Sequence, residues 1–234
     1  MARLPRLTIA GQLHLLVQRG HGAAPVFGTD DDFAAYRRAL AATAPHHGVA
    51  IHAYALTPSQ VLVLATPADA FGLSRLWQAL GRRFGADYNR RHGRSGVLWE
   101  GRFRTTVVDA HAHFLDCCRF VEWAPVRAQL AGSPQEYPWS SAAHHAGGQS
   151  DAVITEHPRY WALGNTPFER EARYRALLEQ PLSAAMEQRL AQASAKGWAV
   201  GDSTFVDSLR GLTERRLCPL RRGRPRQIDK TVPN

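Results

Sequence analysis

Residues 48–66, GVAIHAYALTPSQVLVLAT, contain the pattern that decides the fold of this chain. Two runs, 48–56 and 60–66, are rich in apolar and β-branched residues, which is typical of buried strands. Thr57-Pro58-Ser59 lies between them, and proline and serine favour a tight turn. Two strand-like runs joined by a short turn predict an antiparallel hairpin.

Strands and helices are predicted on both sides of this hairpin. Residues 7–18 have the composition of a strand, and TDDD at 29–32 is a typical helix start with acidic residues at the positive end of the helix dipole. After the hairpin we expect a helix over 72–91, a short strand near 105–109 and a helix over 111–123 that ends before a proline. This order predicts an α+β fold of ferredoxin-like type, in which helices pack on one antiparallel sheet.

The character of the sequence changes after Gly148, and we divide the chain there. Residues 1–148 form the α+β core, closed by an irregular segment at 134–148. Residues 150–217 are predicted to form a small helical appendage, with helices over 167–193 and 203–217. Residues 218–234 are predicted to be a disordered basic tail.

Positive charge dominates the composition. The 234 residues contain 29 Lys and Arg against 20 Asp and Glu, a net charge of +9 and a pI near 10.2. Only Lys196 and Lys230 are lysines, and the arginine fork suits phosphates and guanine edges. An arginine-biased composition would explain the choice of arginine but not the excess of positive charge. A polyanion is therefore the expected partner.

The cysteines and the apolar segments indicate a cytoplasmic protein. Cys117 and Cys118 are adjacent and Cys218 is distant, which fits neither a disulfide framework nor a CxxC metal clip. No secretory signal precedes the core, and no stretch approaches the roughly 20 apolar residues of a membrane span. We expect a soluble, untargeted protein beside the nucleoid.

Arginines cluster on the second predicted helix and on the loop that follows it. They form a candidate phosphate track, whose alternative is an ordinary solvated face; acidic partners at helical spacing are scarce there, Asp87 being the main one. The candidate DNA-binding residues of this track are Arg19, Arg82, Arg83, Arg90, Arg91, Arg94, Arg102 and Arg104.

The tail carries a second DNA-binding candidate. Seven basic residues lie between Arg215 and Lys230, against one acid, Asp229. Arg222-Gly223-Arg224-Pro225-Arg226 resembles an AT-hook core, in which flanking arginines enter a narrow, AT-rich minor groove. The alternative is a solvated basic tail, and both versions predict salt-dependent binding to phosphates.

Seven segments, in order from about residue 1 to 230, together resemble the REP-associated tyrosine transposases, which belong to the HUH single-strand nucleases. Each segment alone has low specificity, and the resemblance is weakest over 150–200. The segments are MARLPR at 1–6, QRG at 18–20, ALTP at 55–58, LWEGRF at 98–103, PVRA at 125–128, YPWSS at 137–141 and RGRPR at 222–226.

The resemblance implies a core that binds folded single-stranded DNA hairpins and cuts beside them. In the family a tyrosine on the last core helix attacks the phosphate, and a divalent metal polarises that phosphate. Two histidines in a His-hydrophobic-His run hold the metal, since residues i and i+2 of a strand point to the same face. An Asn or Gln one helical turn after the tyrosine is the third ligand.

This sequence departs from the family pattern at every chemical position. The segment Leu56-Thr57-Pro58-Ser59-Gln60-Val61-Leu62-Val63 matches the family's metal-binding strand, with Gln60 and Leu62 at the two histidine positions. Phe120 stands at the tyrosine position and Ala124 at the third ligand position. The resemblance therefore implies a chain with no intact catalytic residue, no metal site and no cofactor.

The leading hypothesis is a DNA-binding protein derived from such a transposase, which binds hairpin or single-stranded DNA without cutting it. An alternative is an active transposase or nuclease with a relocated site, for which His14, His52, Tyr54 and Tyr88 are candidates. His111-Ala112-His113 falls at a predicted helix start, where i and i+2 diverge and cannot easily share an ion. A third hypothesis is a scaffold or remnant with no specific ligand.

Overall fold

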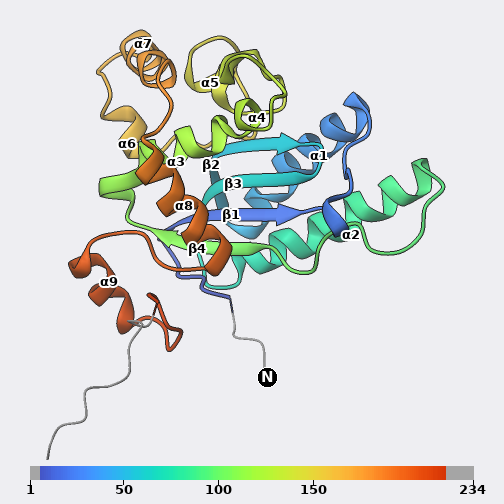
Figure 1. The fold of residues 1–234 in the computed structure, drawn as a ribbon, viewed down its shortest axis with the longest axis horizontal. Helices are drawn as coiled ribbons and strands as arrows, with labels where there is room; N and C mark the ends of the chain where they lie inside the picture. Colours follow the sequence, from blue (N-terminus) through green and yellow to red (C-terminus); the bar gives the residue numbers. More distant parts are fainter. Residues whose placement is uncertain (1–5, 220–234) are drawn as a thin grey trace, which may run out of the picture.

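A four-stranded antiparallel sheet forms the centre of the computed structural model, which describes residues 6–219 (Figure 1). Its strands are β1 (Leu13–Arg19), β2 (Val49–Thr57), β3 (Gln60–Pro67) and β4 (Arg104–Val108), in the spatial order β2-β3-β1-β4. This order, with helices between β1 and β2 and between β3 and β4, is that of a ferredoxin-like fold. The predicted fold class is confirmed, with the hairpin of β2 and β3 at one side of the sheet.

Helices cover both faces of the sheet because the side chains of its strands alternate between two cores. Val61 and Val63 of β3 pack in one cluster with α1 (Asp30–Thr43) and α2 (Gly72–Arg91). Leu62 and Leu64 belong to the opposite cluster, against α3 (Ala110–Glu122) and α8 (Ala184–Lys196). Figure 1 shows the sheet between these two layers. The period of two along the strand therefore assigns neighbouring residues to opposite faces.

The first strand begins six residues later than the sequence predicts. Leu7 and Ile9 are buried, but they pack in a separate small cluster beside β4 and α9 (Ser203–Arg210). Gly11 has a positive φ of 71° and ends a turn that leads into β1. The apolar run over 7–18 thus serves two cores, which strand periodicity alone does not distinguish.

The helix predicted over 167–193 is two helices. α7 (Pro167–Leu178) ends before Pro181, and α8 begins after Ser183, whose hydroxyl accepts a hydrogen bond from the Met186 N–H. Proline lacks an N–H and interrupts a helical ladder, which explains the break. The helix predicted over 203–217 stops at Arg210, the end of α9.

The described chain also contains three single-turn α-helices, α4 (Ala124–Arg127), α5 (Ala142–His145) and α6 (Pro158–Trp161), and three 3-10 turns, η1 (His21–Ala23), η2 (Pro45–His47) and η3 (Pro134–Glu136). A buried carboxylate joins α5 and α7 to α3. Glu122 accepts hydrogen bonds of 2.6 Å from the hydroxyls of Ser141 and Tyr174, and the ring of His145 lies at the same distance. A buried carboxylate needs such partners, so this network fixes how the C-terminal helices meet the core.

Both edges of the sheet are covered by the chain itself. Along β2, Ser140 forms a bridge to Ala55, and the Thr155 N–H donates to the Ile51 carbonyl. Along β4, Val200 pairs with Val108 in parallel, and its N–H donates to Val107. The described stretch 150–217 therefore contacts the same sheet as the core, whereas its division into a separate appendage stays a prediction.

None of the helices between residues 6 and 219 combines the length and the apolar character needed to cross a bilayer.

Candidate nucleic-acid interface

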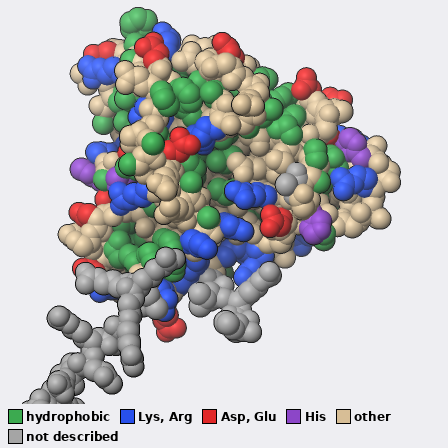
Figure 2. Space-filling model, viewed as in Figure 1, with side chains coloured by type: hydrophobic (Ala, Val, Ile, Leu, Met, Phe, Trp, Pro, Cys, Tyr) green, Lys and Arg blue, Asp and Glu red, His purple; other side chains and the backbone are tan. Residues whose placement is uncertain are grey.

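A basic groove lies beside the β4 edge of the sheet. Two adjoining cavities form it, the larger of about 360 Å³, and Glu100 is the one acidic residue that lines either cavity in the described chain. Figure 2 shows basic side chains gathered on this side of the molecule. We call this the β4 groove, and its basic residues are Arg6, Arg19, Arg102, Arg104, Lys196 and Arg215.

The C-terminal end of α8 forms one wall of the β4 groove. The Arg104 guanidinium donates to the carbonyl of Ala195 at 3.1 Å, and Arg215 donates to the carbonyls of Lys196 and Gly197. Gly197 has a φ of 69°, and a Cβ there would lie 2.4 Å from the Arg215 guanidinium. Glycine is therefore needed where α8 ends and Arg215 crosses it.

Like charges are crowded on the opposite wall. The Arg6 guanidinium lies 4.0 Å above the centre of the Phe103 ring. Burial, and then the neighbouring charge of Arg102, hold the pKa of Arg6 below its ordinary value. A bound anion would relieve both effects, since it solvates a buried cation and offsets its like-charged neighbour.

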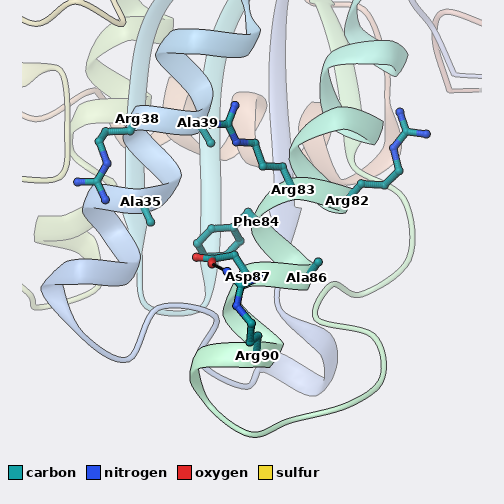
Figure 3. Close-up of a pocket in the computed structure, with 9 residues that line it drawn as sticks. All are labelled: Ala35, Arg38, Ala39, Arg82, Arg83, Phe84, Ala86, Asp87 and Arg90. Carbon is teal, nitrogen blue, oxygen red and sulfur yellow. Dashed lines mark hydrogen bonds and ion pairs between the residues drawn. The ribbon is translucent and has the colours of Figure 1, made fainter.

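A second basic surface lies between α1 and α2, about a cavity of 450 Å³. Arg38 comes from α1, and Arg82, Arg83 and Arg90 come from α2. Figure 3 shows Arg83 directed toward α1 while Arg38 and Arg82 point to the two outer sides. We call this the α1–α2 surface. The predicted track is thus divided, with Arg19, Arg102 and Arg104 in the β4 groove.

Acidic partners hold part of the predicted track. Asp87 forms ion pairs with Arg90 and Arg91, and Arg91 also pairs with the buried carboxylate of Asp32. Burial alone would raise the pKa of Asp32, but hydrogen bonds from His92, the Gly28 N–H and Arg91 hold it below its usual range. Arg91 therefore stabilises a buried charge, whatever its part in DNA binding.

Arg94 lies near the end of α2, with its guanidinium 5.9 Å from the centre of the Tyr88 ring. The tail residues Arg222, Arg224 and Arg226 lie outside the described residues. The sequence did not assign four basic residues to either surface, and it grouped one of them, Arg215, with the tail instead. They are Arg6, Arg38, Lys196 and Arg215.

Three of the four positions that match family catalytic residues meet in one hydrophobic cluster. Leu62, Phe120 and Ala124 are 2%, 6% and 5% exposed and belong to the core between the sheet and α3. Gln60 precedes Leu62 by two residues on the same strand, and therefore on the same face. It pairs with Arg19 in β1, so the β4 groove begins beside these positions.

The residues at these positions do not fit a divalent metal. Leucine, alanine and phenylalanine side chains offer no lone pair, and only the Gln60 amide could contribute one oxygen ligand. Elsewhere among residues 6–219, no group of three or more His, Cys, Asp or Glu is placed to hold a metal ion.

The candidate residues for a relocated site are apart and engaged. His14 and His52 were expected on possibly neighbouring strands, but β3 separates β1 from β2. The His14 ring bonds the Ile9 N–H and the Gln12 carbonyl, and the His52 ring bonds Thr66 and the Thr155 carbonyl.

The two tyrosines and the remaining histidine pair give no second site. The Tyr54 hydroxyl donates to Asp151, and burial and that carboxylate raise the pKa of the phenol. Tyr88 is buried in the cluster that α1 and α2 form with the sheet, and its ring contacts Phe84 and His92. His111 and His113 lie in the first turn of α3, as predicted.

The sequence matches no family model and no curated protein. Among solved structures, the chain is similar to a REP-associated tyrosine transposase bound to a REP hairpin, with a TM-score of 0.52 and 15% identity over 67% of this chain and 93% of that one. A putative transposase from Deinococcus radiodurans R1 aligns with a TM-score of 0.37 and 18% identity over 48% of this chain and 91% of that one. The first of these likenesses establishes a transposase-like fold.

Proposed function

We propose that this chain is a DNA-binding protein that holds hairpin or single-stranded DNA in the β4 groove and does not cut it. The observation that carries the proposal is the position of the groove. It begins at Arg19, next to Gln60, where a transposase of this fold would place its cutting site. The solved relative of the same fold was captured with a REP hairpin.

The chemistry of the groove supports a phosphate backbone as its ligand. Arginine presents paired N–H groups that match two phosphate oxygens, and Lys196 adds a point charge at the end of α8. The groove is lined from five separate parts of the chain, so its six cations are presented by a packed scaffold rather than by one loop. Such contacts position DNA without reading its sequence.

Loss of cleavage follows from the residues at the matched positions. Attack on a phosphodiester needs an oxygen nucleophile, and the Phe120 ring has none. Polarising the phosphate by a metal needs ligands that Leu62 and Ala124 cannot supply. The alternative is an active enzyme that uses a relocated tyrosine. Tyr54 is disfavoured as that nucleophile because its burial and its hydrogen bond to Asp151 keep the phenol protonated.

The proposal extends to the tail and the compartment. Arg222, Arg224 and Arg226 would add contacts to an AT-rich minor groove next to the hairpin. A DNA partner places the protein in the cytoplasm, with the nucleoid. Repression, DNA organisation and assistance to an active relative would all use this binding.

Binding and cleavage are tested in one experiment with purified full-length protein. A labelled hairpin with a single-stranded flank is titrated at about 0.15 M salt with Mg²⁺ or Mn²⁺, and half of each sample is denatured before electrophoresis. We expect a shifted band in the native gel and no covalent band after denaturation. A covalent band would overturn the claim of lost cleavage.

The groove is tested by matched charge removal. Arg102→Ala with Arg104→Ala should weaken hairpin binding at least tenfold. Arg173→Ala with Arg210→Ala removes the same charge from exposed helical positions, paired to Glu169 and Asp207, and should change binding less than threefold. Equal losses in the two variants would mean that net charge, and not the groove, binds the DNA.

A further inference from the structure

A further cavity, of about 420 Å³, lies between the start of α2 and the loop before β4. It shares Arg6, Arg102 and Phe103 with the β4 groove, so the two spaces adjoin. Its other lining includes Phe71, which directly precedes α2, Trp77 of α2 and Gln18 of β1. We call it the α2 pocket. Aromatic walls, amides and flanking arginines are the composition of nucleotide sites.

Phe71 is an aromatic ring held out in solvent at this pocket. Its side chain is 69% exposed, although the chain around it is fixed. The Phe71 N–H donates to the Asp69 carboxylate at 2.7 Å, and the next residue, Gly72, is packed so closely that a Cβ would lie 2.9 Å from the His47 carbonyl. A rigid backbone that presents an exposed ring is a ready stacking platform, since every nucleobase has a flat face.

Trp77 lines the same pocket. Its side chain is 5% exposed, and its indole Nε1–H has no acceptor among residues 6–219. The Arg6 Nε, also at the pocket, is in the same state. Neither atom is exposed to the open cavity, so Trp77 serves the pocket as an aromatic wall.

We propose that the α2 pocket receives a single unpaired nucleobase of the bound DNA. The base stacks on Phe71, and its phosphate lies toward Arg6 and Arg102 where the pocket joins the β4 groove. This inference rests on the proposed function, because the groove must first hold the strand. The inference adds a contact to an unpaired base to the backbone contacts of the proposed function.

The proposal is tested by coupling a change in the protein to a change in the DNA. Each unpaired position of the hairpin flank is replaced in turn by an abasic site, and binding is measured for the wild-type chain and for Phe71→Ala. We expect one abasic position to weaken wild-type binding about tenfold, in line with base–aromatic stacking. Phe71→Ala should bind the intact flank about tenfold more weakly and lose no further affinity at that abasic position.

A matched control is available on α7. Phe168 is 78% exposed and remote in sequence from the pocket, so Phe168→Ala should keep wild-type affinity and the full abasic penalty. A 2-aminopurine placed at the sensitive position should be quenched on binding to the wild-type chain and to Phe168→Ala, and less so on binding to Phe71→Ala.

The outcomes distinguish failure of the pocket assignment from failure of the proposed DNA-binding function. If the hairpin binds through the Arg102 and Arg104 side chains but no abasic position is coupled to Phe71, the pocket assignment is wrong and the DNA-binding function stands. If the wild-type chain binds the hairpin no more tightly than the variant with Arg102→Ala and Arg104→Ala does, both proposals are wrong.

Discussion

The guanidinium of Arg127 lies over the ring of Phe120, 4.6 Å from its centre. The same guanidinium donates to the Phe120 carbonyl, and its Nε faces Glu187 of α8 at 3.5 Å. Burial holds the pKa of Arg127 below its ordinary value, although Glu187 acts in the opposite direction. At the position that matches the family nucleophile, this chain therefore has a cation packed on a hydrocarbon ring, a structural contact.

Phe120→Tyr should not restore DNA cleavage. The substitution returns a hydroxyl beside Arg127, but Leu62 and Ala124 still provide no metal ligand, so the scissile phosphate stays unpolarised. We expect no covalent protein–DNA band with the labelled hairpin in Mg²⁺ or Mn²⁺. The free energy of unfolding should lie within about 1 kcal/mol of the wild-type value. A covalent band from this single variant would show that a metal is held by other residues.

Arg91 and Arg82 should differ in how much they contribute to the stability of the fold. Arg91→Ala removes an ion pair from the buried Asp32 carboxylate, which keeps its other hydrogen bonds, so we expect a loss of about 2 kcal/mol in the free energy of unfolding. Arg82 lies on the α1–α2 surface. Arg82→Ala should therefore change the free energy of unfolding by less than about 0.5 kcal/mol. Urea unfolding measures both. The reverse order of the two variants would contradict this assignment.

Neutralising the β4 groove should reduce the salt dependence of binding. Each phosphate contact on single-stranded DNA contributes about 0.7 to the slope of log K against log salt, so Arg102→Ala with Arg104→Ala should lower the magnitude of the slope by about 1.4. Titrations of a single-stranded oligonucleotide from about 0.05 to 0.3 M salt give the slope. An unchanged slope with weaker binding would mean that these arginines contact no phosphate.

The tail should distinguish between kinds of DNA. Replacing Arg222, Arg224 and Arg226 together by alanine should weaken binding to AT-rich duplex more than binding to hairpins with single-stranded flanks, because AT-rich sequence narrows the minor groove that the tail is expected to enter. Competition between the two DNAs for one protein sample measures the ratio. Equal losses on both would identify the tail as a general phosphate contact.

The stability of the fold should fall on mild acidification because of His14. Burial lowers the pKa of His14 from its ordinary value of 6.5 to about 4, while its bond to the Gln12 carbonyl partly opposes the shift. The unfolded chain therefore takes up a proton first. The stabilisation is complete above pH 6.5 and is lost as pH falls toward 4, by on the order of 3 kcal/mol.

His14→Gln should flatten this dependence between pH 6.5 and 5, by up to about 1.4 kcal/mol per pH unit. Urea unfolding at pH 7, 6 and 5 provides the comparison, with exposed His111→Gln as the control. His52 has a similar lowered pKa of about 4 through burial, so part of the slope should persist in the variant. An unaltered slope would exclude His14 as a source.

The sheet could be predicted from the sequence because its strands obey local rules. The alternation around Leu62 and the turn at Pro58 define the hairpin without reference to the rest of the chain. The break between α7 and α8 also has a local signal, Pro181, although the prediction of one helix over 167–193 ran through it. The change of core between Ile9 and Leu13 depends on which distant side chains are nearby, so periodicity does not contain it.

The candidate site was only partly predictable, for a similar reason. Arg102 and Arg104 were found because they are neighbours in a basic loop. Arg215 and Lys196 reach the same groove because α8 packs on β4, about 90 residues away in sequence, and no local pattern indicates that contact. The α2 pocket also depends on packing, since an exposed Phe71 and a buried Trp77 look alike in sequence.

Ser140 beside β2 and Val200 beside β4 have a consequence for how copies of this chain can meet. An open strand edge offers a row of free N–H and carbonyl groups, and neighbouring molecules readily pair along it. Here segments of the same polypeptide occupy positions on both edges, so joining two sheets into one continuous sheet would first require those segments to be displaced. Several copies assembling on DNA would then contact one another through helix surfaces or through the DNA itself. The covered strand edges also protect the protein against edge-to-edge aggregation.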